Sequence, residues 1–372
     1  MYIKREIEDV IERRSFKKKA IIIYGARQTG KTTLVKNLMK KYDDALYFNA
    51  DFINDREIWK PKSVDYLKTI IQNHKLIVID EAQNIVDIGL VLKTVVDNFP
   101  KTQIIATGSS SFDLSNKTGE SMTGRKWTFV IHPFSYRELA RSRGNYQVKN
   151  ELDFFLTYGM YPEIYNEKQD AELLLTELIN SYLLKDILMW ANIKKSEKLI
   201  HLLQLLAFQI GQMVSYNELS KNLNIDFATV QKYINLLEKC FIIYKLPSFS
   251  KNMRNEIKKS RKIYFWDIGI RNAIIDDFTP FDIRRDKGQI WENFIITELI
   301  KNKLNQNKLK KFYFWRSKDK AEIDLLEIKN KNIKAFEIKL TKKNVRIPPS
   351  FKYYEPKSFS IIHKDNFEEY LL

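Results

Sequence analysis

Cysteine is almost absent from this sequence, because Cys240 is the only one among 372 residues. A single cysteine forms no internal disulfide, so the sequence excludes the disulfide-stabilised secreted scaffolds and favours a reducing compartment. No apolar run approaches the ~20 residues that a membrane-spanning helix needs. The first residues, MYIKREIEDVIERRSFKKK, are charged throughout and lack the apolar core of a signal peptide. We therefore expect a soluble, cytoplasmic protein without a membrane partner.

Acidic residues are also scarce relative to basic ones. The 46 Asp and Glu residues face 63 Lys and Arg residues, which gives a formal net charge of +17. Such an excess favours polyanionic partners, either nucleic acid or an acidic membrane face. A genome rich in Lys and Asn codons would explain part of this excess without any function. The chain length is sufficient for two or three domains, each with its own core.

Short apolar runs alternate with helical segments in the first part of the chain. This alternation predicts an α/β fold with a mostly parallel sheet covered by helices on both faces. The pattern is helical from about residue 151 to 245 and becomes mixed again after residue 261, so we predict three parts with boundaries near 145 and 265. The expected strands of the first part are AIIIY (20–24), ALYFNA (45–50), KLIVID (75–80) and TQIIATG (102–108).

The segment GARQTGKTT satisfies the pattern G-x-x-x-x-G-K-[ST] and lies between an expected strand and an expected helix. In this context backbone amides and the helix N-terminus bind phosphate oxygens. Lys31 would contact the β- and γ-phosphates of ATP, and the hydroxyl of Thr32 would bind Mg²⁺. The predicted nucleotide-binding residues are Gly25, Ala26, Arg27, Gln28, Thr29, Gly30, Lys31, Thr32 and Thr33.

In a second motif, LIVIDEAQ, an apolar strand ends in two consecutive acids, Asp80 and Glu81. Asp80 would hold Mg²⁺, and Glu81 would polarise the attacking water as the catalytic base. The alternative is that these acids only cap the next helix. ATGSSS ends another strand, so Thr107 or Ser109 could hydrogen-bond the γ-phosphate or the water, unless they are simply turn formers.

The motifs YGARQTGKTTL, IVIDEAQ, TGSSS, TGRKWTFVIHPFSYREL and YGMYPEI occur in this order along the chain. In this order they resemble a prokaryotic AAA+-type P-loop ATPase family whose members carry a C-terminal domain similar to restriction-endonuclease folds. The resemblance covers nearly the whole chain. It implies that Arg125 senses the γ-phosphate or acts as an arginine finger, within its own chain or on a neighbour's nucleotide. The alternative is that Arg125 is a solvated loop charge.

The segment SYNELSKNLNIDFATVQKYINLLEKC is typical of a helix, a turn and a second helix. Ser215 with Glu218 forms a capping-box pattern, and Asp226 can cap the second helix. Val230, Ile234 and Leu237 would be buried there, which leaves other side chains for base edges and phosphates, namely Thr229, Gln231, Lys232 and Asn235. Strands and a basic loop (251–262) follow, as in a winged helix that grips DNA. The alternative is a structural lid on the ATPase.

The segment KAEIDLLEIKNKNIKAFEIKLTKK contains a charged hairpin with an expected turn between Asn330 and Lys331. This centre places Asp324 opposite Glu337 on one sheet face, and Lys339 shares that face. With Glu292 on a preceding helix, these residues resemble the PD-(D/E)XK core of restriction endonucleases. That resemblance implies Mg²⁺ ligands at Glu292, Asp324 and Glu337 and a catalytic lysine at Lys339. Because EI rather than P precedes Asp324, a nuclease-like domain without activity and a plain charged hairpin both remain open.

Together these observations predict an AAA+-type P-loop ATPase domain (1–145), a helical lid and winged-helix region (146–265) and a PD-(D/E)XK nuclease-like domain (266–372). We expect ATP and Mg²⁺ as cofactors and Mg²⁺-dependent ATP hydrolysis coupled to nucleic acid, DNA in particular. One alternative is an ATP-dependent switch that regulates protein partners, and another is a metal-dependent nuclease licensed by ATP. Because Arg125 could act on the nucleotide of a neighbouring chain, a homo-oligomer is a further alternative.

Overall fold

The structure is a computed structural model that describes residues 2–108, 122–183, 196–250, 261–308 and 310–372. By its internal contacts the chain divides into two compact units. The first comprises Met1–His132 with Lys239–Phe241, and the second comprises Pro133–Glu238 with Ile242–Leu372. Among the described residues no helix is long and apolar enough to cross a membrane.

The first unit is built on a five-stranded sheet in the order β2-β3-β4-β1-β5, in which every paired strand is parallel. The strands are β1 (Ala20–Tyr24), β2 (Leu46–Asn49), β3 (Leu76–Asp80), β4 (Gln103–Gly108) and β5 (Lys126–Val130). The helices are α1 (Glu6–Arg14), α2 (Lys31–Met39), α3 (Ile53–Ile58), α4 (Val64–Ile71) and α5 (Ile88–Asn98), with a short 3-10 turn at Ala82–Asn84. The expected strands are confirmed.

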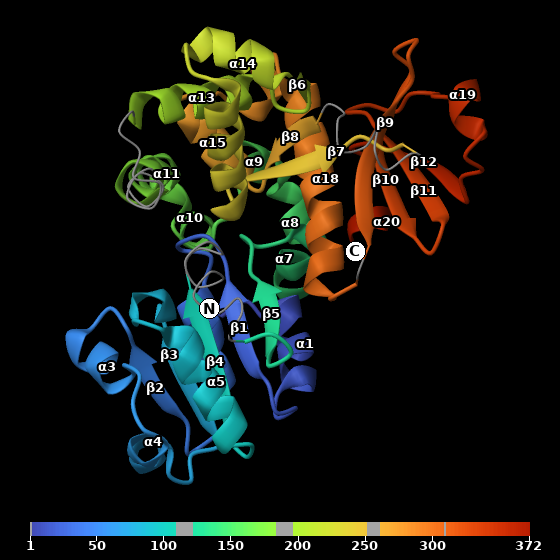
Figure 1. Ribbon diagram of the computed structural model, residues 1–372. Helices are drawn as coiled ribbons and strands as arrows, with labels where there is room; N and C mark the ends of the chain where they lie inside the picture. Colours follow the sequence, from blue (N-terminus) through green and yellow to red (C-terminus); the bar gives the residue numbers. More distant parts are fainter. Residues whose placement is uncertain (1, 109–121, 184–195, 251–260, 309) are drawn as a thin grey trace. The chain divides into compact units, whose positions relative to one another are not determined.

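Helices cover both faces of this sheet (Figure 1). Side chains alternate along β1, so that Ala20 and Ile22 enter one core while Ile21 and Ile23 enter the other. The first core packs on α4 and α5, and the second packs on α1 and α2. Burial on both faces explains why these strands are continuous apolar runs, and the predicted α/β fold is confirmed.

The second unit begins with helices and contains a small sheet in the order β6-β8-β7, whose pairs are antiparallel. Its early helices are α7 (Tyr136–Arg143), α8 (Asn145–Asn150), α9 (Leu152–Tyr158), α10 (Pro162–Asn166) and α11 (Ala171–Glu177), followed by a π-helical segment (Leu178–Leu183). Next come α13 (Ser196–Phe208), β6 (Met213–Val214), α14 (Tyr216–Leu223), α15 (Phe227–Lys239), β7 (Ile243–Pro247), β8 (Arg261–Phe265) and α17 (Ile268–Ile274).

The second unit ends in a four-stranded sheet in the order β12-β11-β10-β9, beside a long helix (Figure 1). β11 pairs with β12 in parallel and with β10 antiparallel. The elements are α18 (Lys287–Asn305), β9 (Lys311–Arg316), β10 (Glu322–Lys329), β11 (Asn332–Ile338), α19 (Pro349–Lys352), β12 (Ser358–Ile362) and α20 (Glu368–Leu371), with 3-10 turns at Lys168–Asp170 and Phe281–Ile283.

The two sheets of the second unit are tied together by the backbone after β7. Phe249 N–H donates to the Phe314 carbonyl over 2.7 Å, and Asn293 of α18 exchanges hydrogen bonds with the backbone of Phe265 in β8. These bonds explain why residues 133–238 and 242–372 form one compact unit. The division of this part of the chain into domains at residue 265 stays a prediction.

Candidate functional site

The predicted phosphate loop connects the end of β1 to the start of α2. Gly30 has a φ of 90°, a conformation that glycine adopts without strain. Gly25 lacks room for a side chain, because a Cβ atom there would lie 2.4 Å from the Ile131 carbonyl oxygen. Both glycines of the motif are therefore required by the backbone path. In the loop Ala26 and Thr29 are buried, whereas Arg27, Gln28 and Thr33 are exposed.

Lys31 directs its ammonium group into this loop. Its Nζ donates to the carbonyl oxygens of Gly25, at 3.2 Å, and Ala26, at 2.9 Å. The Thr29 hydroxyl donates to the same Ala26 carbonyl over 2.8 Å, which fixes the shape of the loop. A positive charge thus lies inside the turn of backbone where the motif binds phosphate oxygens.

Thr32 and Asp80 lie together, as the Mg²⁺ prediction requires. The Thr32 hydroxyl donates to Asp80 Oδ2 over 2.6 Å, and the Tyr47 hydroxyl donates to the same oxygen over 2.7 Å. Among the described residues no group of three His, Cys, Asp or Glu side chains could hold a metal ion. A P-loop site needs no such group, because one hydroxyl and one carboxylate hold Mg²⁺ together with phosphate oxygens. The residues present therefore fit this ion.

Thr107 connects the two acids of the second motif. Its hydroxyl donates to Asp80 Oδ1 and accepts the backbone N–H of Glu81 at 3.1 Å. Glu81 has a left-handed backbone with a φ of 50°, and its carboxylate accepts a hydrogen bond from Gln83 at 2.6 Å. Thr107 is thus bonded to both acids of the motif. Ser109 lies outside the described residues.

Two residues of this site gave no signal in the sequence. Arg5 is buried, and its guanidinium donates to the carbonyl oxygens of Thr29, at 2.9 Å, and His132, at 2.5 Å. It therefore supports the phosphate loop from the charged N-terminal segment. Tyr47 comes from β2, and burial together with its hydrogen bond to Asp80 raises the pKa of its hydroxyl. Neither residue lies within a motif, so local spacing could not reveal them.

Arg125 lies at the wrong edge of the sheet to contact a nucleotide bound by its own chain. Its carbonyl accepts the N–H of Ala20, the first residue of β1, whereas the phosphate loop follows the last residue of that strand. A strand of this length separates the two edges by roughly 16 Å. The Arg125 side chain is exposed and forms an ion pair of 2.6 Å with Asp97. This position corrects the prediction that Arg125 senses the γ-phosphate within its own chain, and it leaves two alternatives, a solvated surface charge and a contact with a neighbour's nucleotide.

The charged hairpin has the predicted register. Leu325 pairs with Phe336 and Lys329 pairs with Asn332, which is the register that places Asp324 opposite Glu337 one step beyond the last recorded pair. The turn residues Asn330 and Lys331 have φ values of 49° and 67°, as a two-residue hairpin turn requires. On its other side, β10 changes register against β9 between Ile323 and Leu326. Such bulges re-aim side chains, and here Asp324 lies within the irregular stretch.

Four acids of the second unit form what we call the acid cluster: Glu292, Glu322, Asp324 and Glu337. Lys339 Nζ lies 2.6 Å from Glu337 Oε1 and 3.5 Å from Asp324 Oδ2. The backbone N–H of Ile338 also donates to Asp324, over 2.8 Å. The structure therefore brings together the residues that the nuclease resemblance selected.

Lys262 of β8 joins the acid cluster although the resemblance did not include it. Its buried Nζ lies 3.1 Å from Glu292 Oε1 and 2.5 Å from Glu322 Oε1. The Tyr264 hydroxyl donates to Glu292 over 2.7 Å. Burial alone would lower the pKa of Lys262, but the carboxylates of the cluster, that of Glu292 foremost, raise it above its usual value. Lys262 is thus held as a cation among the acids.

Two carboxylates of the acid cluster have raised pKa values. Burial raises the pKa of Glu292 to about 7, against the lowering effect of Lys262 and with a further raising effect of Asp324. Burial and Asp324 also raise the pKa of Glu337. Lysines rather than further ligands lie between these acids, and no three acids of the described chain converge as metal ligands. The acid cluster as it stands therefore does not fit a metal ion.

The helix-turn-helix prediction is confirmed at the level of local structure. Ser215 and Asp226 each accept a backbone N–H in the first turn of α14 and α15. In α15, Val230, Ile234 and Leu237 are buried. Gln231 and Lys232 are exposed, Thr229 and Asn235 are half-buried, and Asn235 accepts a hydrogen bond from Lys245 at 2.6 Å. Most of the predicted basic loop (251–260) lies outside the described residues.

Comparison with known protein families gives a match in the first part of the chain. Residues 17–140 match the family described as AAA domain. This region is an AAA-type P-loop domain. The Walker-type ATPase of Pyrococcus abyssi, which is 14% identical, superimposes with a TM-score of 0.50 over 73% of this chain and 96% of its own. At that identity the likeness shows the fold alone.

Beyond the AAA-type domain, the comparisons assign no activity. Residues 149–280 and 287–363 match two families described as domains of unknown function, DUF8612 and DUF4143. An uncharacterized protein of Mycobacterium tuberculosis is 26% identical over 325 residues, which cover 86% of this chain and 70% of that protein. One from Methanocaldococcus jannaschii is 26% identical over 319 residues, covering 73% of this chain and 65% of that protein.

Proposed function

We propose that this protein is a Mg²⁺-dependent ATPase whose nucleotide cycle is coupled to nucleic-acid binding. The observation that carries this proposal is the hydrogen-bonded connection of Thr32, Asp80, Thr107 and Glu81 beside the phosphate loop. These groups come from the ends of β3 and β4 and from the start of α2, which follows β1. Because β1, β4 and β3 are neighbours in a parallel sheet, their carboxyl ends meet where such folds bind ligands.

Each residue has a separate role in this reaction. Lys31 neutralises charge on the transferred phosphate, and Thr32 with Asp80 would hold Mg²⁺. The metal, when bound, neutralises phosphate oxygens and orients them. Glu81 orients the attacking water and accepts its proton, and Thr107 holds the backbone of Glu81 in place. Thr107 is therefore a positioning residue rather than a catalytic one.

The coupling to nucleic acid is supported by the element order α13-β6-α14-α15-β7-β8. This order matches the one expected of a winged helix, in which α15 would be the recognition helix. Its exposed face includes Gln231 and Lys232, and the chain has a net charge of +17. The alternative is a switch that acts on protein partners, and a steep dependence of duplex binding on salt would argue against it.

Phosphate release by the purified full-length protein tests the proposal. Glu81→Gln should retain ATP binding and lose turnover by about 10²–10⁴-fold, because the general base is removed and its shape is kept. Glu57→Gln is a matched control, since Glu57 is an exposed surface acid paired with Lys60. Turnover by Glu81→Gln at the rate of the wild type would refute the assigned chemistry.

The second candidate function concerns residues 266–372, which resemble a restriction-endonuclease-like domain. We infer that this domain does not cleave in the conformation described, because Lys262 and Lys339 lie among the acids of the cluster where a metal ion would have to bind. Incubation of supercoiled plasmid with Mg²⁺ or Mn²⁺, with and without ATP, tests this inference. We expect no cutting by the wild type, whereas cutting that disappears in Asp324→Ala would establish the nuclease.

A further inference from the structure

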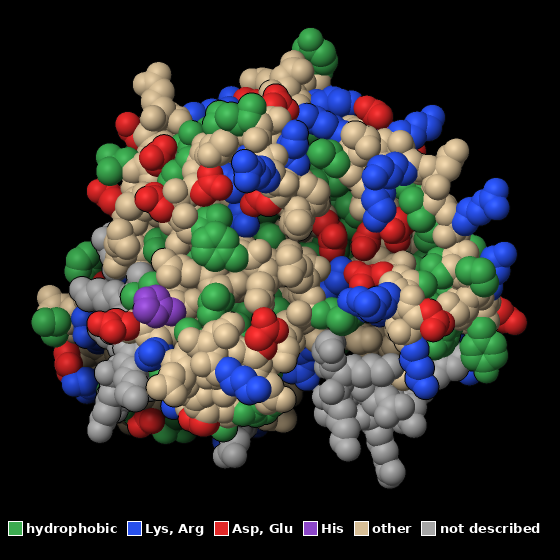
Figure 2. Space-filling model, turned by 90° about the horizontal axis from the view of Figure 1, so that it is seen from above, with side chains coloured by type: hydrophobic (Ala, Val, Ile, Leu, Met, Phe, Trp, Pro, Cys, Tyr) green, Lys and Arg blue, Asp and Glu red, His purple; other side chains and the backbone are tan. Residues whose placement is uncertain are grey.

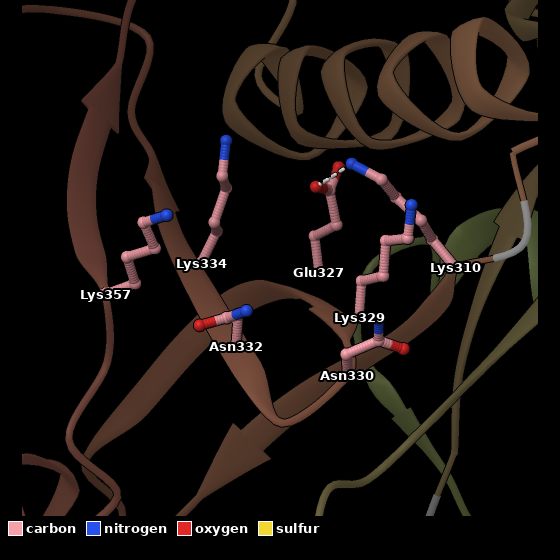
Figure 3. Close-up of a pocket in the computed structure, with 7 residues that line it drawn as sticks. All are labelled: Lys310, Glu327, Lys329, Asn330, Asn332, Lys334 and Lys357. Atoms are coloured by element: carbon pink, nitrogen blue, oxygen red, sulfur yellow. Dashed lines mark hydrogen bonds and ion pairs between the residues drawn. The ribbon is translucent and has the colours of Figure 1, made fainter.

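The face of the molecule drawn in Figure 2 shows no single patch of basic side chains. Figure 2 shows Lys and Arg side chains spread over the face in view, with Asp and Glu side chains among them. A local concentration occurs instead around a pocket with a volume of about 300 Å³ at the tip of the β10–β11 hairpin. We call it the lysine pocket, and its lining residues are Lys310, Glu327, Lys329, Asn330, Asn332, Lys334 and Lys357 (Figure 3).

The hairpin determines where these side chains point. Glu327 pairs with Lys334 across the two strands, so their side chains share a sheet face. In Figure 3 both extend to the same side, and Lys329 does so as well. The Lys357 N–H donates to the Ile333 carbonyl over 2.8 Å, which holds the segment before β12 against the hairpin. The lysines are therefore presented by paired backbone rather than by a free loop.

The lysine pocket has far more positive than negative charge. Its one carboxylate, Glu327, is buried and already forms an ion pair with Lys310, while Lys303 lies 4.0 Å away. Within the described part of the chain, no carboxylate forms an ion pair with Lys329, Lys334 or Lys357. Burial lowers the pKa of Lys303, and neighbouring lysines lower it further against the effect of Glu327. An anion would relieve the repulsion among these ammonium groups.

The lining chemistry selects the kind of anion. No arginine lines the pocket. It therefore lacks the guanidinium group that forms bidentate hydrogen bonds with guanine or with a carboxylate. It also has no aromatic side chain on which a base could stack. A cage for one free phosphate would use backbone N–H groups or a helix N-terminus, whereas here lysines converge from four surface segments. Lysines arranged in this way suit successive phosphates of an extended polyanion.

We propose that the lysine pocket binds backbone phosphates of a nucleic acid, independently of base sequence. It is a second contact region, separate from the exposed face of α15, and it rests on the proposed nucleic-acid role. Glu327 holds Lys310 in place in the absence of the ligand and opposes the anion when it binds. Lysines at the pocket thus set affinity and its salt dependence, and any sequence preference arises elsewhere.

The test is fluorescence anisotropy with the full-length protein and a labelled duplex of about 30 base pairs of arbitrary sequence, over a range of KCl concentrations. The variant is Lys334→Gln/Lys357→Gln. The control is Lys318→Gln/Lys352→Gln, which removes the same charge from exposed lysines outside the pocket. Because all four side chains are exposed, folding should be unaffected, and circular dichroism with ATP turnover checks this.

The pocket variant should bind the duplex roughly tenfold or more weakly, and its slope of log Kd against log salt should fall by about 2, one for each lost phosphate contact. The control should match the wild type. Glu327→Gln should shift affinity the other way, because it releases Lys310 and removes an opposing charge. Equal slopes for the pocket variant and the control would refute the proposal while leaving the ATPase intact.

Two further outcomes also decide the matter. If tripolyphosphate at constant ionic strength raises the melting temperature of the wild type but not of the pocket variant, while both bind the duplex with equal affinity and salt dependence, the pocket takes a small phosphate ligand instead. Absence of duplex binding by the wild type, with normal ATP turnover, would remove the nucleic-acid role itself. That result would refute the proposed coupling as well as the pocket, and so differs from failure of the pocket alone.

Discussion

The nucleotide site and the acid cluster both hold carboxylates out of water, but they pair these carboxylates with different partners. At the nucleotide site the donors to Asp80 are the neutral hydroxyls of Thr32, Tyr47 and Thr107. In the acid cluster the partners include the ammonium groups of Lys262 and Lys339. A carboxylate bonded to hydroxyls keeps its charge for a cation, whereas one paired with lysine has its cation already. Acid content alone therefore does not identify a metal site.

The largest expected effect comes from Lys262→Met. This change leaves Glu292 without its cation and Glu322 with Arg316 alone, at 3.5 Å, so the free energy of unfolding at pH 8 should fall by about 3–5 kcal/mol. Mn²⁺ should then raise the melting temperature of the variant and leave that of the wild type unchanged. Urea denaturation and thermal melts measure both effects. Lys303→Met, which removes a lysine 4.0 Å from Glu327, is the control. If the variant is as stable as the wild type and its melting temperature does not respond to Mn²⁺, Lys262 does not act as the cation of the acid cluster. The proposed difference between the nucleotide site and the acid cluster would then be wrong.

The acid cluster should also make stability depend on pH. The pKa of Glu292 is about 7 in the folded protein, above its ordinary 4.5. The folded state therefore binds its proton more tightly than the unfolded state, and stability is lost as pH rises from 4.5 through 7. Relative to Glu292→Gln, the wild type should lose about 3 kcal/mol across this interval. Urea denaturation of both proteins at pH 5 and pH 8 measures the difference, and a constant difference would contradict the assignment.

A smaller effect is expected from Tyr47→Phe at the nucleotide site. The substitution removes one of several hydroxyl donors to Asp80 and leaves the ring in place. The loss should be about 1 kcal/mol in stability or Mg²⁺-ATP affinity, because Thr32 and Thr107 still satisfy the carboxylate. Calorimetric titration measures it, with Tyr146→Phe, an exposed tyrosine, as the control. A complete loss of binding would mean that the hydroxyl itself contacts the ligand.

The smallest effect within one chain is expected from Arg125→Ala. The side chain is exposed and lies at the far edge of the sheet, so ATP affinity and melting temperature should not change. If a neighbouring chain uses Arg125, turnover should fall only at protein concentrations where oligomers form. Measurement of turnover against concentration, beside sedimentation of the same samples, separates these cases. Weaker ATP binding by a dilute monomer would contradict the position of Arg125.

The hairpin and Arg125 show where prediction from sequence succeeded and where it did not. Two strands with a period of two and a short polar turn leave one register, so Asp324 and Glu337 could be paired from spacing alone. Arg125 was selected by a motif, and a motif does not state at which end of a strand its residue falls. The position followed only from the parallel pairing of β5 with β1.

The sequence by itself determined the phosphate loop, the acids at the end of β3 and the hairpin, because each depends on local backbone geometry and side-chain period. Only the tertiary structure decided that Tyr47 and Thr107 hold Asp80, that Arg5 supports the loop and that Lys262 enters the acid cluster. Such contacts join residues far apart in the chain. They follow from the packing of whole elements, which no local pattern specifies.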